Sequence, residues 1–252
     1  MPDNRTVIVT GAGSARGIGR GACLRLAAAG WSVAALDLEE DAARETAELA
    51  AGANGGRAIG LACDVTKGDQ VDAAVSEVEG ELPPVAALVN NAGITAPTRF
   101  LDIDEGEWDR IFDVNVRGTY LVTRRVLPGL VERGYGRIVN LSSVSAVRGG
   151  GVFGGSHYSA AKAAVLGLTR ALAREVGPNG VTCNALAPGL IGTDITAGKL
   201  SPERQEQILA DVPVRRQGTV GEVASMVVYL CSEDAGYVTG ATLDINGGSH
   251  IY

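Results

Sequence analysis

A tyrosine and a lysine stand four residues apart, at Tyr158 and Lys162. On a helix this spacing places both side chains on one face, one turn apart. A free tyrosine has a pKa of about 10 and is a poor base at neutral pH, but a fixed cation nearby favours the phenolate. Lowering that pKa by about 3 units takes roughly 4 kcal/mol, which a close cation in a partly dry cleft can supply. The pair therefore has the composition of a general base, although such a pattern also occurs by chance on solvated helix faces.

A glycine-rich turn, residues 11–19 (GAGSARGIG), follows a β-branched run at residues 5–10 and precedes a helical segment at 17–29. The next apolar run, 32–37, ends in Asp37. In such a strand–helix–strand unit, the glycines let backbone N–H groups and the helix N-terminus approach a pyrophosphate. Asp37 lies where a carboxylate can accept a hydrogen bond from the 2′-hydroxyl of the adenine ribose. The unit predicts a dinucleotide-binding site.

The same alternation continues along the whole chain, and Pro128 is expected to kink or break the longest helix. Strands are predicted at 5–10, 32–37, 57–63, 85–90, 137–142, 181–187 and 241–246, and helices at 17–29, 39–51, 67–81, 104–134, 158–176, 202–211 and 222–232. Right-handed crossovers make this a single α/β domain, 1–252, with a doubly wound (Rossmann) seven-stranded parallel sheet and helices on both faces.

Polar residues and glycines cluster where the predicted strands end, and ligands of doubly wound sheets bind beyond those ends. They are Asp64 after the third strand, residues 91–93 (NAG) after the fourth, Ser143 after the fifth and Thr193 after the sixth. Asn115 lies in the middle of a predicted helix, where a buried amide needs hydrogen-bond partners. The polar segment 193–218 is a candidate lid over the site.

Composition narrows the possible partners and location. The net charge of −7 argues against nucleic acid and anionic membranes, and no apolar run reaches the length of a membrane span. The four cysteines are widely spaced, which predicts reduced core thiols in a cytoplasmic protein, and no Cys/His cluster indicates a metal. Residues 1–10 run directly into a strand, so we expect no signal peptide.

Taken together, these motifs resemble the short-chain dehydrogenase/reductase family over essentially the whole chain. The resemblance rests on Thr10-Gly11, Gly17-Ile18-Gly19, residues 90–93 (NNAG), Asn115, Ser143, Tyr158 with Lys162, and Pro188-Gly189 with Thr193. The segments 186–196 and 246–248 are similar to those of 3-oxoacyl-(acyl-carrier-protein) reductase-like members.

The resemblance implies an enzyme that transfers hydride between a nicotinamide cofactor and a small-molecule substrate. Tyr158 would be the general acid/base, and Lys162 would lower its pKa and hold the nicotinamide ribose. Ser143 would hydrogen-bond the reacting oxygen, and Asn115 would support a water-linked proton path to Lys162. The implied cofactor-binding residues are Gly11, Ser14, Arg16, Gly17, Ile18, Gly19, Asp37, Leu38, Asp64, Val65, Asn91, Ala92, Gly93, Tyr158, Lys162, Pro188, Gly189, Ile191 and Thr193.

The resemblance also implies a homotetramer, in which helices 104–132 and 159–176 pair across a two-fold axis. The apolar residues of these helices suit that pairing and packing on the sheet equally; examples are Val122, Val126, Leu130, Leu168 and Leu172.

Two departures from the family pattern leave alternatives open. The glycine turn has two extra residues, which look like Ala15 and Arg16; an alternative register makes Ala15 the middle small residue and Gly17 the last. The loop between Ser143 and Tyr158 is also about two residues longer than usual, so the usual spacing counted back from Tyr158 reaches Ser145. We prefer Ser143, because the strand-end pattern VNLSS fixes it and a glycine-rich loop absorbs insertions at little cost.

Asp37 decides the expected cofactor. A 2′-phosphate would face this carboxylate, which favours NAD over NADP, whereas Arg16 suits a phosphate and pulls the other way. We expect an apolar pocket with few charges, bordered by Ser145, Val147, Phe153, His157, Leu190 and the segment after Thr193, and therefore a neutral secondary alcohol or ketone as substrate. His157 contacts substrate or merely packs at the helix start. The alternatives are an NADPH-dependent 3-oxoacyl-(acyl-carrier-protein) reductase and a non-enzymatic dinucleotide sensor.

Overall fold

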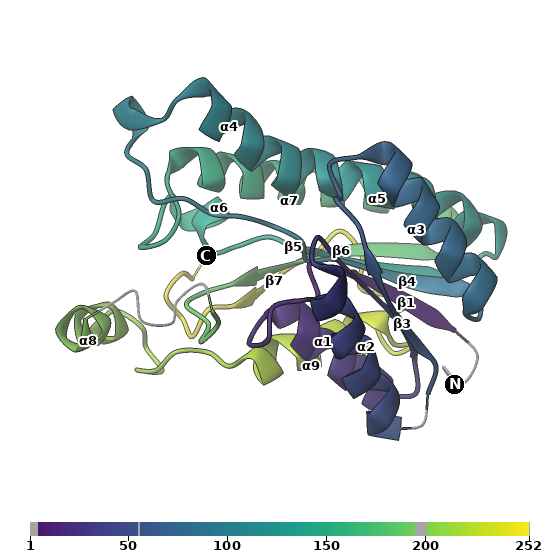
Figure 1. Cartoon of the computed structure of the whole chain (residues 1–252). Coiled ribbons are helices and arrows are strands. Elements are labelled where there is room, and N and C mark those ends of the chain that lie inside the picture. The colour runs from purple at the N-terminus through teal and green to yellow at the C-terminus, as the bar shows by residue number, and fades with distance from the viewer. Residues whose placement is uncertain (1–4, 55, 195–200, 252) are drawn as a thin grey trace.

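Seven short, apolar segments form one parallel sheet (Figure 1). The computed structural model describes residues 5–54, 56–194 and 201–251. Most of these strands are buried along their length, as near-continuous apolar runs in parallel sheets are. The strands are β1 (Thr6–Thr10), β2 (Ser32–Asp37), β3 (Ala58–Ala62), β4 (Val85–Asn90), β5 (Gly136–Leu141), β6 (Val181–Pro188) and β7 (Thr242–Ile245).

The strand order is β3-β2-β1-β4-β5-β6-β7. The chain builds outward from β1 to β3, then returns to the other side of β1 with β4. This reversal between β1 and β4 is the point at which doubly wound sheets open a ligand crevice at the strands' carboxyl ends. The predicted α/β fold with a seven-stranded, doubly wound parallel sheet is confirmed.

Helices cover both faces of the sheet, with α1, α2 and α9 on one face and α3, α5 and α7 on the other (Figure 1). The longer helices are α1 (Ile18–Ala28), α2 (Glu40–Asn54), α3 (Gly68–Glu81), α4 (Glu105–Phe112), α5 (Gly118–Glu132), α7 (Ser156–Val176), α8 (Pro202–Ala210) and α9 (Val220–Cys231). The short ones are α6 (Ser145–Arg148), the 3₁₀ turns η1 (Phe100–Asp102) and η3 (Gly177–Asn179), and the π-helical η2 (Asp113–Arg117).

The region predicted as one helix, 104–134, differs from that prediction. It consists of α4, the π-helical η2 and α5, and the irregularity lies at residues 113–117 rather than at Pro128. α5 continues through Pro128 to Glu132, so a break at this proline is wrong. A π-helical turn accommodates one extra residue within a helix and often occurs at functional sites. Here it contains Asn115, which is fully buried.

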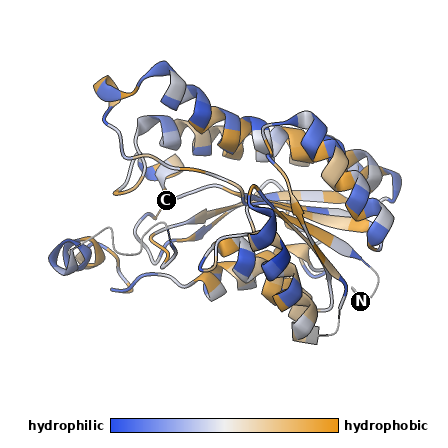
Figure 2. Cartoon of the chain, viewed as in Figure 1, coloured by the Kyte–Doolittle hydropathy of each residue, from blue (hydrophilic) through white to orange (hydrophobic). Residues whose placement is uncertain are grey.

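Hydrophobic residues concentrate in the sheet and on the inner helix faces, whereas the outer helix faces are mostly hydrophilic (Figure 2). All four cysteines are free and buried within this interior, as the sequence predicts. Burial raises the pKa of the Cys23 thiol to about 12, so this thiol stays protonated and unreactive at neutral pH. In the described ranges, no helix is long and apolar enough to cross a membrane.

Candidate active site

The glycine turn is fixed to the end of β4 by side chains from both strands. Asn91 Nδ2 donates to the carbonyls of Thr10 (3.0 Å) and Gly11 (2.8 Å), and Thr10 Oγ1 accepts from the backbone N–H groups of Asn91 and Ala92. Gly11 has a φ of +65°, which favours glycine. A β-carbon on Gly19 would collide with the Gly11 carbonyl oxygen and lie 2.6 Å from Asn91 Nδ2. Gly19 therefore lets the start of α1 pack directly against β1.

We expect Gly19→Ala to destabilise the fold by about 1–3 kcal/mol, because the added methyl group fits only if the backbone of residues 11 and 12 shifts. Urea unfolding of both proteins measures this difference. Gly52→Ala is the matched control: a β-carbon there meets nothing within 4 Å, and alanine in a helix is expected to be neutral or stabilising by up to about 1 kcal/mol. Equal stability of Gly19→Ala and the wild type would contradict this account of the turn.

Most of the predicted cofactor residues line one cavity of about 810 Å³ at the carboxyl ends of the strands. A second space of about 500 Å³ adjoins it and shares the lining residues Gly11, Asp37, Ala92, Gly93 and Ile94. The larger cavity brings together Gly11, Ser14, Gly17, Ile18, Asp37, Asn91, Ala92, Gly93, Ser143, Tyr158, Lys162, Pro188, Gly189, Ile191 and Thr193. The smaller one adds Leu38, Asp64 and Val65. Two predicted residues line neither space: Gly19 lies beneath the turn, and Arg16 is held by Asp194.

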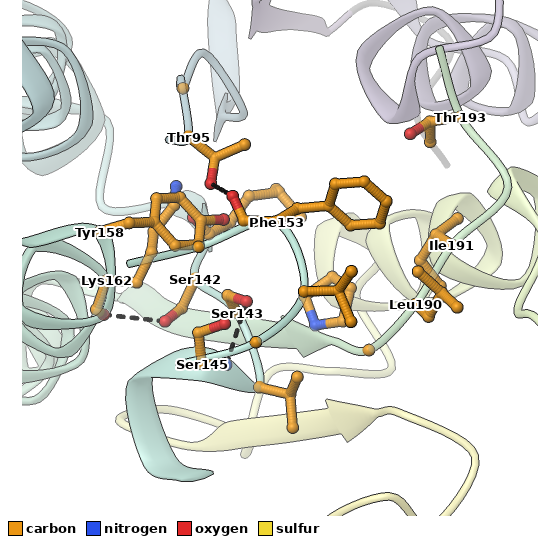
Figure 3. Close-up of a pocket in the computed structure, with 18 of the residues that line it drawn as sticks. Thr95, Ser142, Ser143, Ser145, Phe153, Tyr158, Lys162, Leu190, Ile191 and Thr193 are labelled. Carbon is orange, nitrogen blue, oxygen red and sulfur yellow. Dashed lines mark hydrogen bonds between the residues drawn. The ribbon is translucent and has the colours of Figure 1, made fainter. Parts of the chain in front are cut away.

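Tyr158 enters this cavity from the first turn of α7, behind the glycine-rich loop (Figure 3). A β-carbon on Gly154 would lie 3.1 Å from Tyr158 Cε1, so the loop needs glycine there to pass the ring. The loop is also anchored to α7, because Gly150 N–H donates to Ser159 Oγ at 2.9 Å. The loop and the helix thus fix the position of the Tyr158 ring.

Of the two serines, only Ser143 affects the pKa of the Tyr158 phenol, which the Ser143 side chain lowers. Ser143 Oγ also accepts from the backbone N–H of Ser145 at 3.1 Å, where α6 begins. Both serines line the cavity, and Ser145 is 5% exposed. This influence on Tyr158 agrees with the preference for Ser143.

Lys162 lies one helical turn after Tyr158 and is almost fully buried. Its Nζ donates to the Leu141 carbonyl at 2.8 Å and lies 5.8 Å from the centre of the Tyr158 ring. Burial lowers the pKa of the Lys162 ammonium from 10.5 to about 8, because the charged form loses its water.

The expectation that Tyr158 has a lowered pKa is not met in this structure. Burial raises the pKa of the phenol, and the hydrogen bond with Ser143 only partly opposes that effect. The physical reason is the direction of Lys162, whose ammonium is bonded to a strand carbonyl rather than to the phenol oxygen. Tyr158 is therefore a phenol at neutral pH, the form that can donate a proton to a substrate oxygen.

Asn115 reaches the same region from the π-helical turn. Its Nδ2 donates to the carbonyls of Ile94 (2.9 Å) and Ile111 (2.8 Å), while its buried Oδ1 has no hydrogen-bond partner. A β-carbon on Gly93 would lie 2.7 Å from Asn115 Oδ1 and 3.1 Å from Lys162 Nζ, so both atoms lie beside this glycine. Asn115 therefore presents an open acceptor close to the lysine.

The substrate end of the cavity differs from the prediction in its charge. Phe153, Leu190 and Ser145 line it as expected, and Leu190 and Ile191 face Ser143 across it (Figure 3). Val147 is not among the lining residues. Three charged residues that the sequence did not single out also line the cavity: Arg148, Arg204 and Asp211. Arg148 ends α6, Arg204 lies in α8, and Asp211 follows α8 directly. No sequence motif indicates that these elements lie at the same cavity as Tyr158.

Of the two roles considered for His157, substrate contact and packing at the helix start, the structure supports packing. It is fully buried, is absent from the cavity lining, and its Nε2 lies 2.8 Å from Glu107 Oε1 on α4. This contact joins the start of α7 to α4. The residue immediately before Tyr158 therefore supports the helix from behind instead of touching substrate.

Comparison with known proteins agrees with this geometry. The family described as "Enoyl-(Acyl carrier protein) reductase" matches residues 11–250. The chain is 44% identical to an uncharacterized short-chain type dehydrogenase/reductase of Sinorhizobium fredii over 98% of both chains. It is 37% identical to a 3-oxoacyl-(acyl-carrier-protein) reductase of Staphylococcus epidermidis, over 98% of this chain and 100% of that one. It is 39% identical to an acetoacetyl-CoA reductase of Rhizobium meliloti, over 98% and 99% of the two chains. The chain therefore belongs to the short-chain dehydrogenase/reductase family and is an NAD(P)-dependent oxidoreductase that acts on CH–OH groups.

Proposed function

We propose that the protein is an NAD-dependent dehydrogenase that interconverts a small, neutral secondary alcohol and its ketone. The observation that carries this proposal is one cavity lined by Ser143, Tyr158 and Lys162 at one end and by Asp37 at the other. The first three residues can bind and protonate a carbonyl oxygen, and Asp37 suits a ribose with a free 2′-hydroxyl. Phe153 and Leu190 both line the cavity and provide apolar walls for the substrate.

Each residue has a distinct role in this proposal. Tyr158 exchanges a proton with the substrate oxygen, and Ser143 hydrogen-bonds that oxygen and orients it. Lys162 supplies positive charge near the phenol, and the open Asn115 Oδ1 accepts a hydrogen bond on the path by which the proton leaves. When bound, the nicotinamide supplies or accepts the hydride.

The glycine turn fits a dinucleotide. Gly11 and Gly17 leave its surface free of β-carbons, and Ser14 and Ile18 line the cavity beside the start of α1. Backbone N–H groups at a helix N-terminus bind phosphate oxygens well. Asp37 and Leu38 would hold the adenosine ribose, Asp64 and Val65 the adenine, and Lys162 with Thr193 the nicotinamide end.

The first test of this proposal is the choice of cofactor. We expect the wild type to bind NADH at least about tenfold more tightly than NADPH, because the Asp37 carboxylate repels a 2′-phosphate. In Asp37→Asn, which keeps the shape but removes the charge, this preference should fall by about tenfold or more. Calorimetric titration at one salt concentration measures both. Tighter NADPH binding by the wild type would contradict the NAD assignment.

A second candidate function is reduction of a 3-oxoacyl thioester with NADPH, and one observation favours it. Arg148 and Arg204 line the cavity, where they could attract the phosphates of a coenzyme A or carrier-protein substrate. Two of the relatives named above are a 3-oxoacyl-(acyl-carrier-protein) reductase and an acetoacetyl-CoA reductase. Assaying acetoacetyl-CoA reduction beside oxidation of neutral secondary alcohols separates the two candidates; turnover of the thioester alone would favour the second.

We also propose a cytoplasmic homotetramer, in line with the family. Val122, Val126, Leu130 and Leu172 are buried in the chain's own core, so they are not available to pair with a second copy. α4 and α5 instead expose Trp108 and Tyr120. Sedimentation of the purified protein tests this assembly, and a monomer would refute it.

A further inference from the structure

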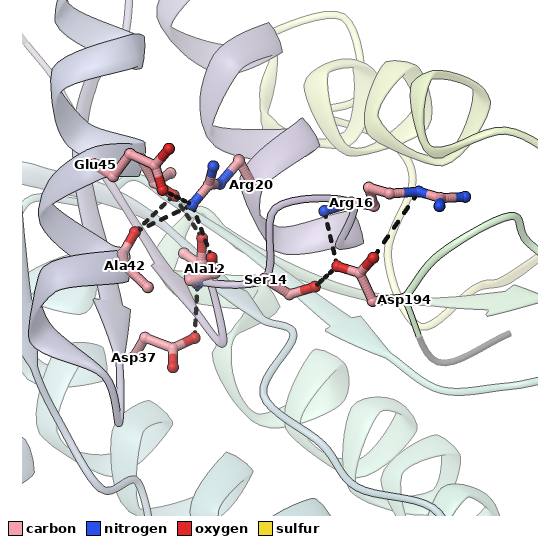
Figure 4. Close-up of polar contacts among 10 residues, drawn as sticks. Ala12, Ser14, Arg16, Arg20, Asp37, Ala42, Glu45 and Asp194 are labelled. Atoms are coloured by element: carbon pink, nitrogen blue, oxygen red, sulfur yellow. Dashed lines mark hydrogen bonds and ion pairs between the residues drawn. The ribbon is translucent and has the colours of Figure 1, made fainter. Parts of the chain in front are cut away.

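Two carboxylates hold the glycine turn from opposite sides (Figure 4). On one side, Gly13 N–H donates to Asp37 Oδ2 at 2.6 Å. On the other, Asp194 Oδ2 accepts from Ser14 Oγ at 2.8 Å and from Arg16 N–H at 3.0 Å. Asp194 follows β6, so it reaches the turn from a segment 180 residues away in the sequence. These donors already form a small anion-binding site, and a side chain of the protein occupies it.

The arginines near this turn are engaged as well. The Arg16 guanidinium turns toward the same carboxylate, with Nε 3.9 Å from Asp194 Oδ1. Arg20, in the first turn of α1, is buried; its Nη2 donates to the Gly13 carbonyl at 2.8 Å and pairs with Glu45 at 2.7 Å. Both Arg16 and Arg20 therefore already have carboxylate partners.

The position of the turn relative to Asp37 gives these contacts a consequence for the cofactor. Asp37 ends β2, where the ribose 2′ position of a dinucleotide is expected. The 2.6 Å contact with Gly13 places residues 13–16 beside that position, and Ser14 lines the same cavity as Asp37. A phosphate on the 2′-oxygen would need donors and cations from this stretch, because charge-assisted contacts dominate phosphate binding.

We propose that Asp194 is a second determinant of cofactor specificity, which selects NAD over NADP by holding Ser14 and Arg16 and by adding negative charge beside the turn. Specificity often needs a repulsive element as well as an attractive one, and Asp194 would supply it together with Asp37. The Ser14 hydrogen bond and the Arg16 N–H contact lower the pKa of the Asp194 carboxyl, so it is ionised at neutral pH. This inference rests on the proposed preference for NAD.

The test compares calorimetric titrations of the full chain with NADH and NADPH at one salt concentration. Asp194→Asn removes the charge and releases Arg16, so NADPH affinity should rise by about tenfold while NADH affinity changes by less than about threefold. Asp194 is exposed, so this substitution is expected to leave the fold intact. In the background Arg16→Gln, the same substitution should raise NADPH affinity by less than about threefold, because the released cation is gone.

Each outcome decides the inference. An equal gain for both dinucleotides would mean that Asp194 competes with the shared pyrophosphate, and an equal loss would mean that it only fixes the fold of the turn; either result overturns the proposal. An unchanged NADH-to-NADPH ratio overturns it as well. A wild type that prefers NADPH would refute the proposed function and the inference that rests on it, whereas an unchanged ratio in an NAD-preferring protein would refute the inference alone. A wild type that binds neither dinucleotide would overturn both.

Discussion

Tyr158→Phe is expected to lower kcat by at least about 10³-fold, the largest effect of any single substitution in this protein. Phenylalanine keeps the ring that packs behind Gly154 but removes the only atom of Tyr158 that can exchange a proton with the substrate oxygen. The hydroxyl of Ser143 remains and can still orient that oxygen, so some activity from positioning should persist. Steady-state kinetics with the best substrate, in both directions, measures the loss.

The matching measurement is cofactor affinity, which should change by less than about threefold in Tyr158→Phe, since the glycine turn and Asp37 are untouched. Tyr237→Phe serves as the control, because this tyrosine is fully exposed and does not line the cavity, so its kinetics should equal those of the wild type. If Tyr158→Phe binds NADH normally and turns over at the wild-type rate, Tyr158 is not the acid/base. Loss of cofactor binding together with turnover would point to a structural role instead.

The elements of the sheet could be predicted from the sequence because local patterns determine them. Strands buried on both faces appear as short apolar runs, and each predicted strand lies within one or two residues of an observed one, as with 32–37 for β2. The π-helical turn at Asn115 could not be predicted, because one shifted hydrogen bond leaves the apolar periodicity almost unchanged. The break expected at Pro128 is absent for a different reason. Proline disfavours a helix locally, but α5 continues through it.

The residues of the site could be predicted to the extent that each lies at a strand end or in a motif. Contacts between distant loops could not: nothing near Asp194 in the sequence indicates that it binds Ser14. The same holds for Arg204, which reaches the cavity only because α8 lies over it. The spacing of Tyr158 and Lys162 was informative about proximity but not about direction, since a four-residue spacing does not say which acceptor a lysine ammonium will choose.

Lys162→Met is expected to remove most activity and at the same time to stabilise the fold at pH 7 by about 1–2 kcal/mol. The shift of the Lys162 pKa from 10.5 to about 8 means that burying the charged form costs about 3 kcal/mol. Methionine has a similar length and no charge, so it avoids that cost. The substitution also leaves the Leu141 carbonyl without its hydrogen-bond donor, which lowers the free energy of unfolding by about 1–2 kcal/mol. If Lys162 is catalytic as proposed, its charge is needed at the site although burying it is costly to the fold.

The pH dependence separates this explanation from better packing by methionine. Between about pH 8 and 10.5 the unfolded chain keeps the lysine proton that the folded chain has lost, so wild-type stability rises with pH across this range. Lys162→Met lacks that rise. Its advantage should be complete below about pH 8 and should shrink as the pH approaches 10.5. Urea unfolding of both proteins at pH 7, 8, 9 and 10 measures it, with Lys67→Met, an exposed lysine, as a control expected to change stability by less than about 0.5 kcal/mol. An advantage that stays constant with pH would show that the buried charge is not its source, because only the titration of Lys162 itself can make the two stability curves converge.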